Sequence, residues 1–156
     1  MTEPTLRSSH LFTLTLTVDP NMTDLGETPY GRRRIATVTG GHFEGEELRG
    51  SVLPSPGGDW LLMRRDGILQ LDVRLTLKTD DGHLVYMSYR GMRHGPAWVI
   101  EKLNKGEKVD PSQYYFRATP WFETASEKYR FLNRIVCVST GRRDPTGPVY
   151  EVFQIL

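Results

Sequence analysis

Arginine, aspartate and tyrosine side chains recur at alternate positions in the middle of the chain. Asp72 and Arg74 are two residues apart, and Tyr86 and Arg90 share one parity in the next extended run. Arginine binds carboxylate and carbonyl oxygens bidentately, and a positioned carboxyl group can act as a general acid or base. These residue types at this spacing predict a site for an oxygenated small molecule.

A second cluster of such residues lies at 115–124. Tyr115 and Arg117 alternate there before a proline and an aromatic, acidic turn that contains Trp121 and Glu123. Loops at a barrel mouth often hold ligands, which makes Glu123 a candidate general acid or base. The alternative is that the aromatic residues close the barrel end and that Glu123 only precedes a helix, where the helix dipole favours a negative charge.

These side chains need strands to hold them in rows. Asp66-Gly67 and Asp81-Gly82 are strong two-residue hairpin signals on either side of an alternating run, 68–78. The apolar residues of that run fall on one face and its polar residues on the other. The segments 60–65, 68–78 and 83–90 are therefore predicted to form a three-stranded meander.

The rest of the chain continues the same pattern. A short helix is predicted between Ser126, which can cap it, and Leu132. About eight strands with one short helix near the C-terminus cannot form an α/β sheet, so we predict an all-β fold, a single antiparallel barrel of residues 11–156 after an extended or disordered tail, 1–10. The further strands are expected at 12–18, 34–39, 114–119, 134–139 and 149–156.

Each central strand has one apolar side, which we call the dry side, and one side that mixes aromatic and charged residues. In a closed barrel, one of these two sides must point inward. If the dry side points inward, Asp72 and Arg74 belong to the exterior, where an ion pair contributes little. If the mixed side points inward, it lines a cavity, and the dry outer side must be covered by another subunit. The second arrangement predicts a homo-oligomer.

Charge and composition argue against several classes of function. Lys and Arg number 20 against 19 Asp and Glu, so no net field favours nucleic acid or an acidic membrane surface. No run approaches the roughly 20 apolar residues of a membrane-spanning helix, and no signal-peptide pattern is present, which predicts a cytoplasmic protein. The four histidines lack metal-ligand spacing and the glycine-rich segments lack a phosphate-loop context, so neither a metal nor a cofactor is predicted. The lone Cys137 sits in an alternating run, as a small core residue would.

With these segments in place, the chain resembles an uncharacterised domain-of-unknown-function family of small bacterial and fungal proteins. The resemblance implies an antiparallel barrel similar to calycin, allene oxide cyclase and dirigent barrels, which hold apolar or oxygenated small molecules. It also implies that Asp59, Asp72, Arg74, Arg117 and Glu123, the polar positions of the shared motifs, are pocket residues. Those motifs are TGGHFEG at 39–45, GSVLP at 50–54, GDW at 58–60, DG at 66–67, LDVR at 71–74, TDDG at 79–82, YFR at 115–117, FET at 122–124, LNR at 132–134 and GR at 141–142.

Three hypotheses follow. The leading one is a small-molecule-binding barrel whose arginines anchor an oxygen and whose aromatic residues pack the carbon frame of the ligand. The second is a cofactor-independent isomerase or cyclase, in which Asp72 or Glu123 is the general acid or base and Arg74 or Arg117 stabilises an oxyanion. The third is an interaction protein whose dry faces fill the barrel. The predicted pocket comprises Trp60, Asp72, Arg74, Tyr86, Arg90, Tyr115, Arg117 and Glu123.

Overall fold

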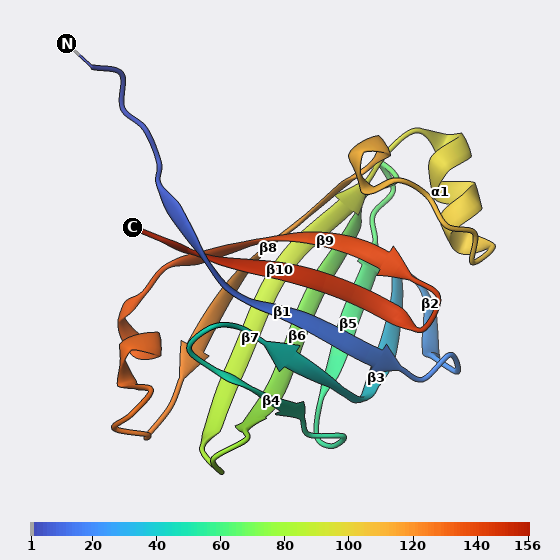
Figure 1. The fold of residues 1–156 in the computed structure, drawn as a ribbon. Coiled ribbons are helices and arrows are strands. Elements are labelled where there is room, and N and C mark those ends of the chain that lie inside the picture. The colour runs from blue at the N-terminus through green and yellow to red at the C-terminus, as the bar shows by residue number, and fades with distance from the viewer. Residues whose placement is uncertain (1) are drawn as a thin grey trace.

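Antiparallel strands make up most of the protein in the computed structural model, which describes residues 2–156 (Figure 1). A single α-helix and two short 3-10 helices interrupt them within this range. The elements are β1 (Ser8–Val18), β2 (Thr23–Thr28), β3 (Gly31–Glu44), β4 (Arg49–Val52), β5 (Gly58–Met63), β6 (Leu69–Thr79), β7 (Leu84–His94), α1 (Ala97–Asn104), η1 (Pro111–Gln113), β8 (Tyr115–Glu123), η2 (Arg130–Arg134), β9 (Cys137–Asp144) and β10 (Gly147–Ile155).

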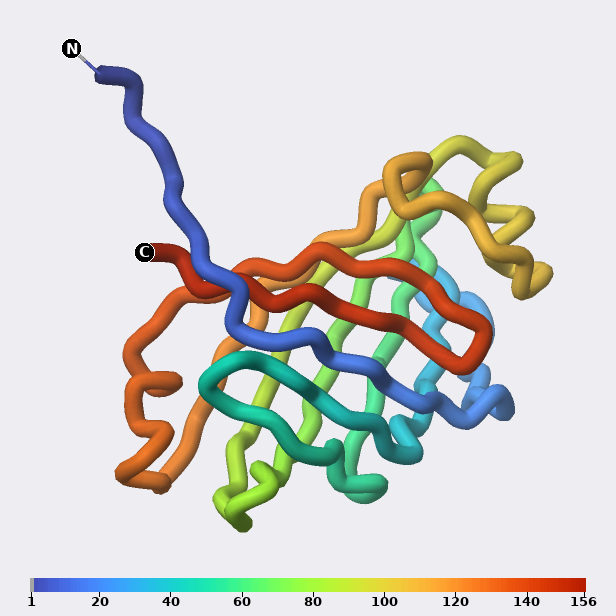
Figure 2. The backbone as a smooth tube through the Cα atoms, in the orientation of Figure 1, coloured from blue at the N-terminus to red at the C-terminus, as the bar shows by residue number. Residues whose placement is uncertain are grey.

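The strands close into a barrel because β1 pairs with β10 on one side and with β3 on the other. From β10 the order continues through β9, β8 and β7 to β6. β4 and β5 both pair with β3 and β6, one after the other, and so share one place in the ring. The result is an eight-stranded barrel with β2 as an extra strand on β3, which confirms the predicted fold class (Figure 2).

The dry faces of the strands point into the barrel. On β6, Val73 and Leu75 are each 1% exposed, whereas Asp72 is only half-buried and Arg74 is exposed. Burying a row of leucine and valine side chains stabilises the fold by about 1.5–3 kcal/mol for each residue, whereas burying unpaired charges costs free energy. The arrangement with the mixed side inward is therefore wrong. A dry outer side that a second subunit would have to cover is then also no argument for an oligomer.

The α-helix lies earlier in the chain than predicted. α1 begins after Pro96, and its buried residues Val99 and Leu103 are four apart, so both face the barrel. The segment from Ser126 to Leu132, predicted as the helix, instead forms turns followed by the 3-10 helix η2. Ser126 does act as a local cap, since its Oγ accepts a hydrogen bond of 3.3 Å from the Tyr129 N–H.

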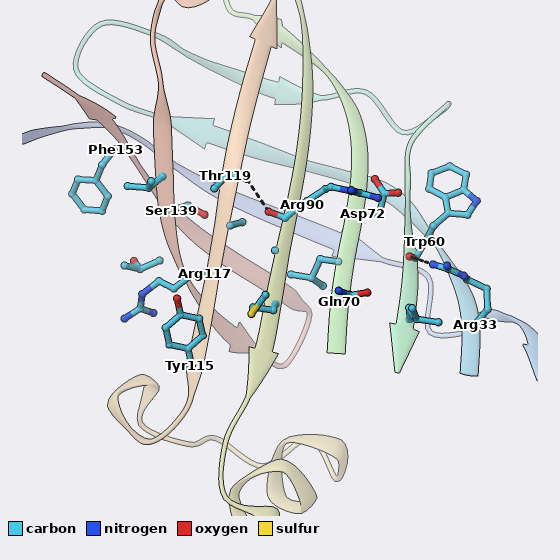
Figure 3. A pocket seen from close by; sticks show the side chains of 17 residues that line it. Arg33, Trp60, Gln70, Asp72, Arg90, Tyr115, Arg117, Thr119, Ser139 and Phe153 are labelled. Atoms are coloured by element: carbon cyan, nitrogen blue, oxygen red, sulfur yellow. Dashed lines mark hydrogen bonds between the residues drawn. The ribbon is translucent and has the colours of Figure 1, made fainter. Parts of the chain in front are cut away.

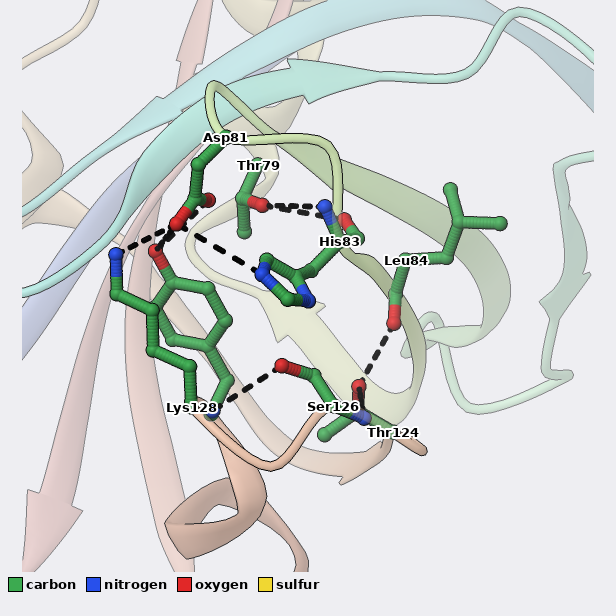
Figure 4. A network of polar contacts seen from close by, with 8 residues as sticks. Thr79, Asp81, His83, Leu84, Thr124, Ser126 and Lys128 are labelled. Atoms are coloured by element: carbon green, nitrogen blue, oxygen red, sulfur yellow. Dashed lines mark hydrogen bonds and ion pairs between the residues drawn. The ribbon is translucent and has the colours of Figure 1, made fainter.

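Side-chain hydrogen bonds hold this segment against the β6–β7 hairpin in place of a helix (Figure 4). The Tyr129 hydroxyl donates to Asp81 Oδ1 over 3.0 Å, and Lys128 Nζ lies 2.5 Å from Asp81 Oδ2. The Thr124 N–H donates to Asn133 Oδ1, and Asn133 Nδ2 donates back to the Thr124 carbonyl. Side-chain hydrogen bonds of this kind compete with helix formation.

The N-terminal strand is longer than predicted. β1 already pairs with β10 at Ser8, opposite Ile155, so residues 8–10 belong to the barrel and not to the tail. Residues 2–7 have no secondary structure and extend away from the barrel in Figure 1, while Met1 lies outside the described residues. No helix in residues 2–156 has the length and apolar character needed to cross a membrane.

Candidate functional site

The barrel interior is not solidly apolar, because polar side chains enter it at the end that α1 covers. There a cavity of about 220 Å³ is bordered by Leu103 of α1 and by Val18 and Met22 at the β1–β2 connection. We call this cavity the chamber. Its polar lining consists of Arg34 of β3, Asp59 of β5, Arg93 of β7, Arg143 of β9, Tyr150 of β10 and Asn104 of α1.

Asp59 faces inward because its backbone partners do. It lies opposite Ala36 on β3 and Val73 on β6, and both of those side chains are buried in the core. Its Oδ1 accepts a 3.0 Å hydrogen bond from the backbone N–H of Asp72. Burial raises the pKa of the Asp59 carboxyl to about 7, with a further rise from the Asp72 charge and a partial offset from that hydrogen bond. Near neutral pH the group is therefore present in both protonation states.

Two tyrosines stand beside this carboxyl. Tyr89 lies on the same rung of the sheet as Asp59, since both pair with Val73. Its ring meets that of Tyr150 edge to face, with 5.0 Å between centroids, and each residue is 2% exposed. Burial, then the neighbouring phenol and the Asp59 charge, raise the pKa of Tyr89. The Tyr89 hydroxyl is thus neutral and interacts with the Tyr150 hydroxyl. Tyr150 lines the chamber, and burial raises its pKa as well.

Three arginines lie nearer the open end of the chamber. Arg34 lies opposite Leu61, two residues along β5 from Asp59, and Arg93 lies opposite Leu69 at the start of β6. The Nε atoms of Arg34 and Arg93 are buried without an acceptor. Burial, and then the positive charge of Arg143, lower the pKa of Arg93. Within residues 2–156, no carboxylate lies within 4.0 Å of any of these three guanidinium groups.

The predicted pocket residues lie on the other side of the barrel wall. Five of the eight border a groove of about 630 Å³ on the outer face, which we call the outer groove. In Figure 3, Arg90 extends toward Asp72 in its middle, and the Arg117 guanidinium carbon lies 5.2 Å from the centre of the Tyr115 ring. The groove members from the prediction are Trp60, Asp72, Arg90, Tyr115 and Arg117.

The other three predicted residues do not border the outer groove. Tyr86 and Glu123 face each other across β7 and β8 on the outer surface, where Tyr86 is 39% exposed. Arg74 is also exposed on the outer side of β6. Of the polar positions suggested by the resemblance, Asp59 alone enters the chamber.

Sequence reasoning missed the other polar residues of the chamber, although one signal was available. On β7 the inward row reads Val85, Met87, Tyr89, Gly91, Arg93, so polar side chains replace apolar ones toward one end of a dry face. A polar residue on a buried face is more informative than an exposed one. Arg34 belongs to a run of three arginines in the sequence. Only the pairing of β3 with β5 shows which of these three side chains points inward.

Cysteine chemistry and metal binding were the remaining possibilities. Cys137 is buried in the core, as predicted, and burial raises the pKa of its thiol to about 11, so the thiol stays protonated near neutral pH. Residues 2–156 contain no group of three or more His, Cys, Asp or Glu side chains placed to hold a metal ion.

The chain is similar in sequence and in fold to known proteins. Residues 6–155 match the model of a family described as proteins of unknown function, DUF3237. The chain is 37% identical over 153 residues to a UPF0311 protein of Rhodopseudomonas palustris, covering 98% of this chain and 99% of that protein. The crystal structure of that conserved protein of unknown function has a TM-score of 0.93 and covers 99% of this chain and 100% of its own.

Two further solved structures share the barrel. A beta-barrel like protein of Acinetobacter baumannii is 36% identical with a TM-score of 0.85, covering 99% of each chain. An enzyme from the fungus Penicillium herquei is 22% identical with a TM-score of 0.74, covering 100% of this chain and 99% of that one. At that identity the fungal likeness shows the fold alone.

Proposed function

Because this chain belongs to the DUF3237 family of proteins of unknown function, we propose a function from the geometry of its own chamber. The chamber binds a small oxygenated molecule, and Asp59 acts on that molecule as a general acid or base in a cofactor-independent isomerisation or cyclisation. Asp59 carries this proposal, because a carboxyl group with a pKa of about 7 can both accept and return a proton near neutral pH.

The chamber supplies the parts that such a reaction needs. The ionised Asp59 would take a proton from a carbon next to a carbonyl group, and the electron pair of the broken C–H bond would move onto the carbonyl oxygen. The neutral hydroxyl of Tyr150, which lines the chamber together with Asp59, would donate a hydrogen bond to that oxygen. Asp59 would then return the proton to a different atom of the substrate.

The size of the chamber limits the substrate. A volume of about 220 Å³ is the space of roughly seven water molecules at about 30 Å³ each. The apolar part of the wall, from Leu61, Leu69, Leu71 and Phe116, suits a carbon skeleton. We therefore expect a small molecule with an apolar body and one oxygenated end.

Hydrogen exchange at carbon tests the acid–base role without knowledge of the natural substrate. The protein is incubated in D₂O with a panel of small ketones, lactones and keto acids, and loss of the proton signal next to the carbonyl is followed by NMR. We expect exchange of at least one compound, and we expect Asp59→Asn to slow it by about a hundredfold or more.

Glu123→Gln is the matched control, because Glu123 is an exposed carboxylate on the outer face. It should exchange the same compound at the wild-type rate. Exchange that survives in Asp59→Asn, or that disappears in Glu123→Gln, would refute the proposed role of Asp59.

The outer groove is a second candidate site, for binding alone. Its volume of about 630 Å³ lies within the usual range of ligand pockets, and Arg90 and Arg117 border it beside aromatic side chains. A ligand there should lose affinity in Arg117→Gln and keep it in Arg93→Gln, and a ligand in the chamber should show the reverse pattern.

The homo-oligomer and the cytoplasmic location stay predictions. The exposed Trp60, Met92 and Tyr115 around the outer groove are the apolar surface that a second copy could cover. A buried, unpaired cysteine is compatible with a reducing compartment. Gel filtration with light scattering checks the first prediction, and cell fractionation checks the second.

A further inference from the structure

The three arginines of the chamber form a cluster of positive charge without a counter-charge. Arg34, Arg93 and Arg143 all line the same cavity of about 220 Å³. Within residues 2–156, their guanidinium groups make no hydrogen bond to a side-chain acceptor and no ion pair. Partly buried charges are normally paired, and like charges brought together in a barrel lower the stability of the fold. A protein that keeps three of them in one cavity gains nothing in stability from them.

Asp59 does not act as the missing partner. Its carboxyl lies deeper in the barrel than the arginines and already accepts a hydrogen bond from the backbone of Asp72. Along β5 the position opposite Arg34 is two residues beyond Asp59, which is about 7 Å of strand. On β6, Arg93 lies opposite Leu69 and Asp59 lies opposite Val73. These two positions on β6 are four residues apart, which is about 13 Å. The chamber thus has a deep tier with a carboxyl and a phenol, and an outer tier of guanidinium groups.

The apolar side chains of the chamber lie between and around these tiers. Leu61 on β5 and Leu71 on β6 stand beside the polar groups, and Phe116 lies opposite Arg93. A ligand that spans the chamber would therefore place a carbon body against these residues and its charged end against the arginines.

We infer that Arg34, Arg93 and Arg143 bind the carboxylate of a small, largely apolar carboxylic acid and present the rest of that molecule to Asp59. The role of Asp59 in this inference rests on the proposed function, whereas the carboxylate site rests on the three arginines alone. Guanidinium groups are the side chains best matched to a planar carboxylate. The bound carboxylate supplies the counter-charge that the fold lacks.

Benzoate and benzamide provide a test with matched probes, because they share size and shape and differ in charge. Binding to the whole chain is measured by calorimetry and by thermal shift at about pH 6, where Asp59 is mostly protonated and does not repel an anion. We expect benzoate to bind and to raise the melting temperature, and we expect benzamide to bind at least about tenfold more weakly.

Single substitutions then locate the site. Arg93→Gln and Arg34→Gln should each weaken benzoate binding by roughly tenfold or more. Arg117→Gln, which removes an arginine from the outer groove, should leave the benzoate affinity unchanged. The comparison of the two probes needs no variant, so it holds even if an arginine substitution prevents folding.

Two outcomes would overturn the inference. One is benzamide binding as tightly as benzoate to the wild-type chain, and the other is benzoate affinity that depends on Arg117 and not on Arg93. Failure of the proposed acid–base function has a different signature, because it leaves carboxylate binding intact while hydrogen exchange persists in Asp59→Asn.

Discussion

At the scale of single residues, the chamber concentrates groups that the fold stabilises poorly. Asp59 carries a raised pKa, and the Nε atoms of Arg34 and Arg93 are buried without an acceptor. Ser139 is a further side chain of this kind within residues 2–156, and it borders the outer groove. Perturbed and unpaired polar groups gather at functional sites more often than in ordinary cores, which favours the chamber over the outer groove.

The raised pKa of Asp59 makes a prediction about pH and stability. The folded value of about 7 lies above the usual 3.8, so the folded protein holds a proton that the unfolded chain releases. This contribution to stability is complete below about pH 4 and is lost as the pH rises through about 7. Asp59→Asn removes the titration. The free energy of unfolding of the wild type, relative to this variant, should therefore fall between about pH 5 and pH 8, by an amount on the order of a few kcal/mol.

Urea unfolding of both proteins at the two pH values measures this difference. Asparagine keeps an oxygen that can accept the hydrogen bond from the Asp72 N–H, so the variant is a fair reference. A difference in stability that does not change with pH would show that the folded-state pKa of Asp59 is not raised.

At the scale of elements, α1 closes the chamber with one face. Val99 and Leu103 are buried, and Leu103 also lines the cavity, whereas Trp98 on the other face is 52% exposed. Leu103→Ala should lower the free energy of unfolding by about 2–5 kcal/mol because it leaves a cavity, and it should also weaken any ligand in the chamber. Trp98→Ala should change stability by less than about 1 kcal/mol. Equal losses in urea unfolding would mean that α1 does not pack as described.

The opposite end of the barrel is closed by packing and by a polar network. The Phe12 ring lies 5.4 Å from that of Phe43 and 5.8 Å from that of Phe122, between centroids. Next to these rings, the Asp81 network fastens the segment before η2 to the β6–β7 hairpin. One end of the barrel is therefore sealed, and the chamber occupies the other.

The Asp81 network predicts sensitivity to acid. The hydrogen bond from Lys128, followed by those from Thr79 and Tyr129, lowers the pKa of Asp81, so its contribution to stability is present above about pH 4 and is lost as the pH falls below that value. Lys128→Met should move the midpoint of acid unfolding toward higher pH. Lys105→Met, which removes an exposed partner of Glu101 on α1, should leave it in place. Circular dichroism during acid titration compares the two midpoints, and a shared shift would argue against the network.

At the scale of the whole molecule, β1 is the strand that makes the sheet a barrel. It pairs with β10 from Ser8 to Thr15 and with β3 from Thr13 to Val18. Removal of residues 1–6 should alter the free energy of unfolding by about 0.5 kcal/mol or less, since residues 2–6 are exposed. Removal of residues 1–14 should abolish cooperative thermal unfolding. A cooperative transition in the longer deletion would show that closure through β1 is dispensable.

The pattern of single residues was sufficient for much of this fold. Alternation in 68–78 and the turns at Asp66-Gly67 and Asp81-Gly82 predicted β6 and its neighbours, because period-two hydrophobicity and turn chemistry are local properties. The same pattern placed Cys137 in the core. It failed for α1, whose apolar face has only two buried residues, and for 126–132, where bonds to the distant Asp81 replaced a helix.

The sequence by itself determined that every central strand has one apolar face and one mixed face. It was also sufficient to predict the barrel fold and the family. Only the tertiary structure decided that the leucine faces turn inward, that Asp72 and Arg74 lie outside, and that Asp59 meets Tyr150 in the chamber. The physical reason is that alternation separates two faces without saying which one the closed sheet encloses. The residues that meet inside come from strands far apart in the chain, and pairing across the barrel is set by closure and not by local sequence.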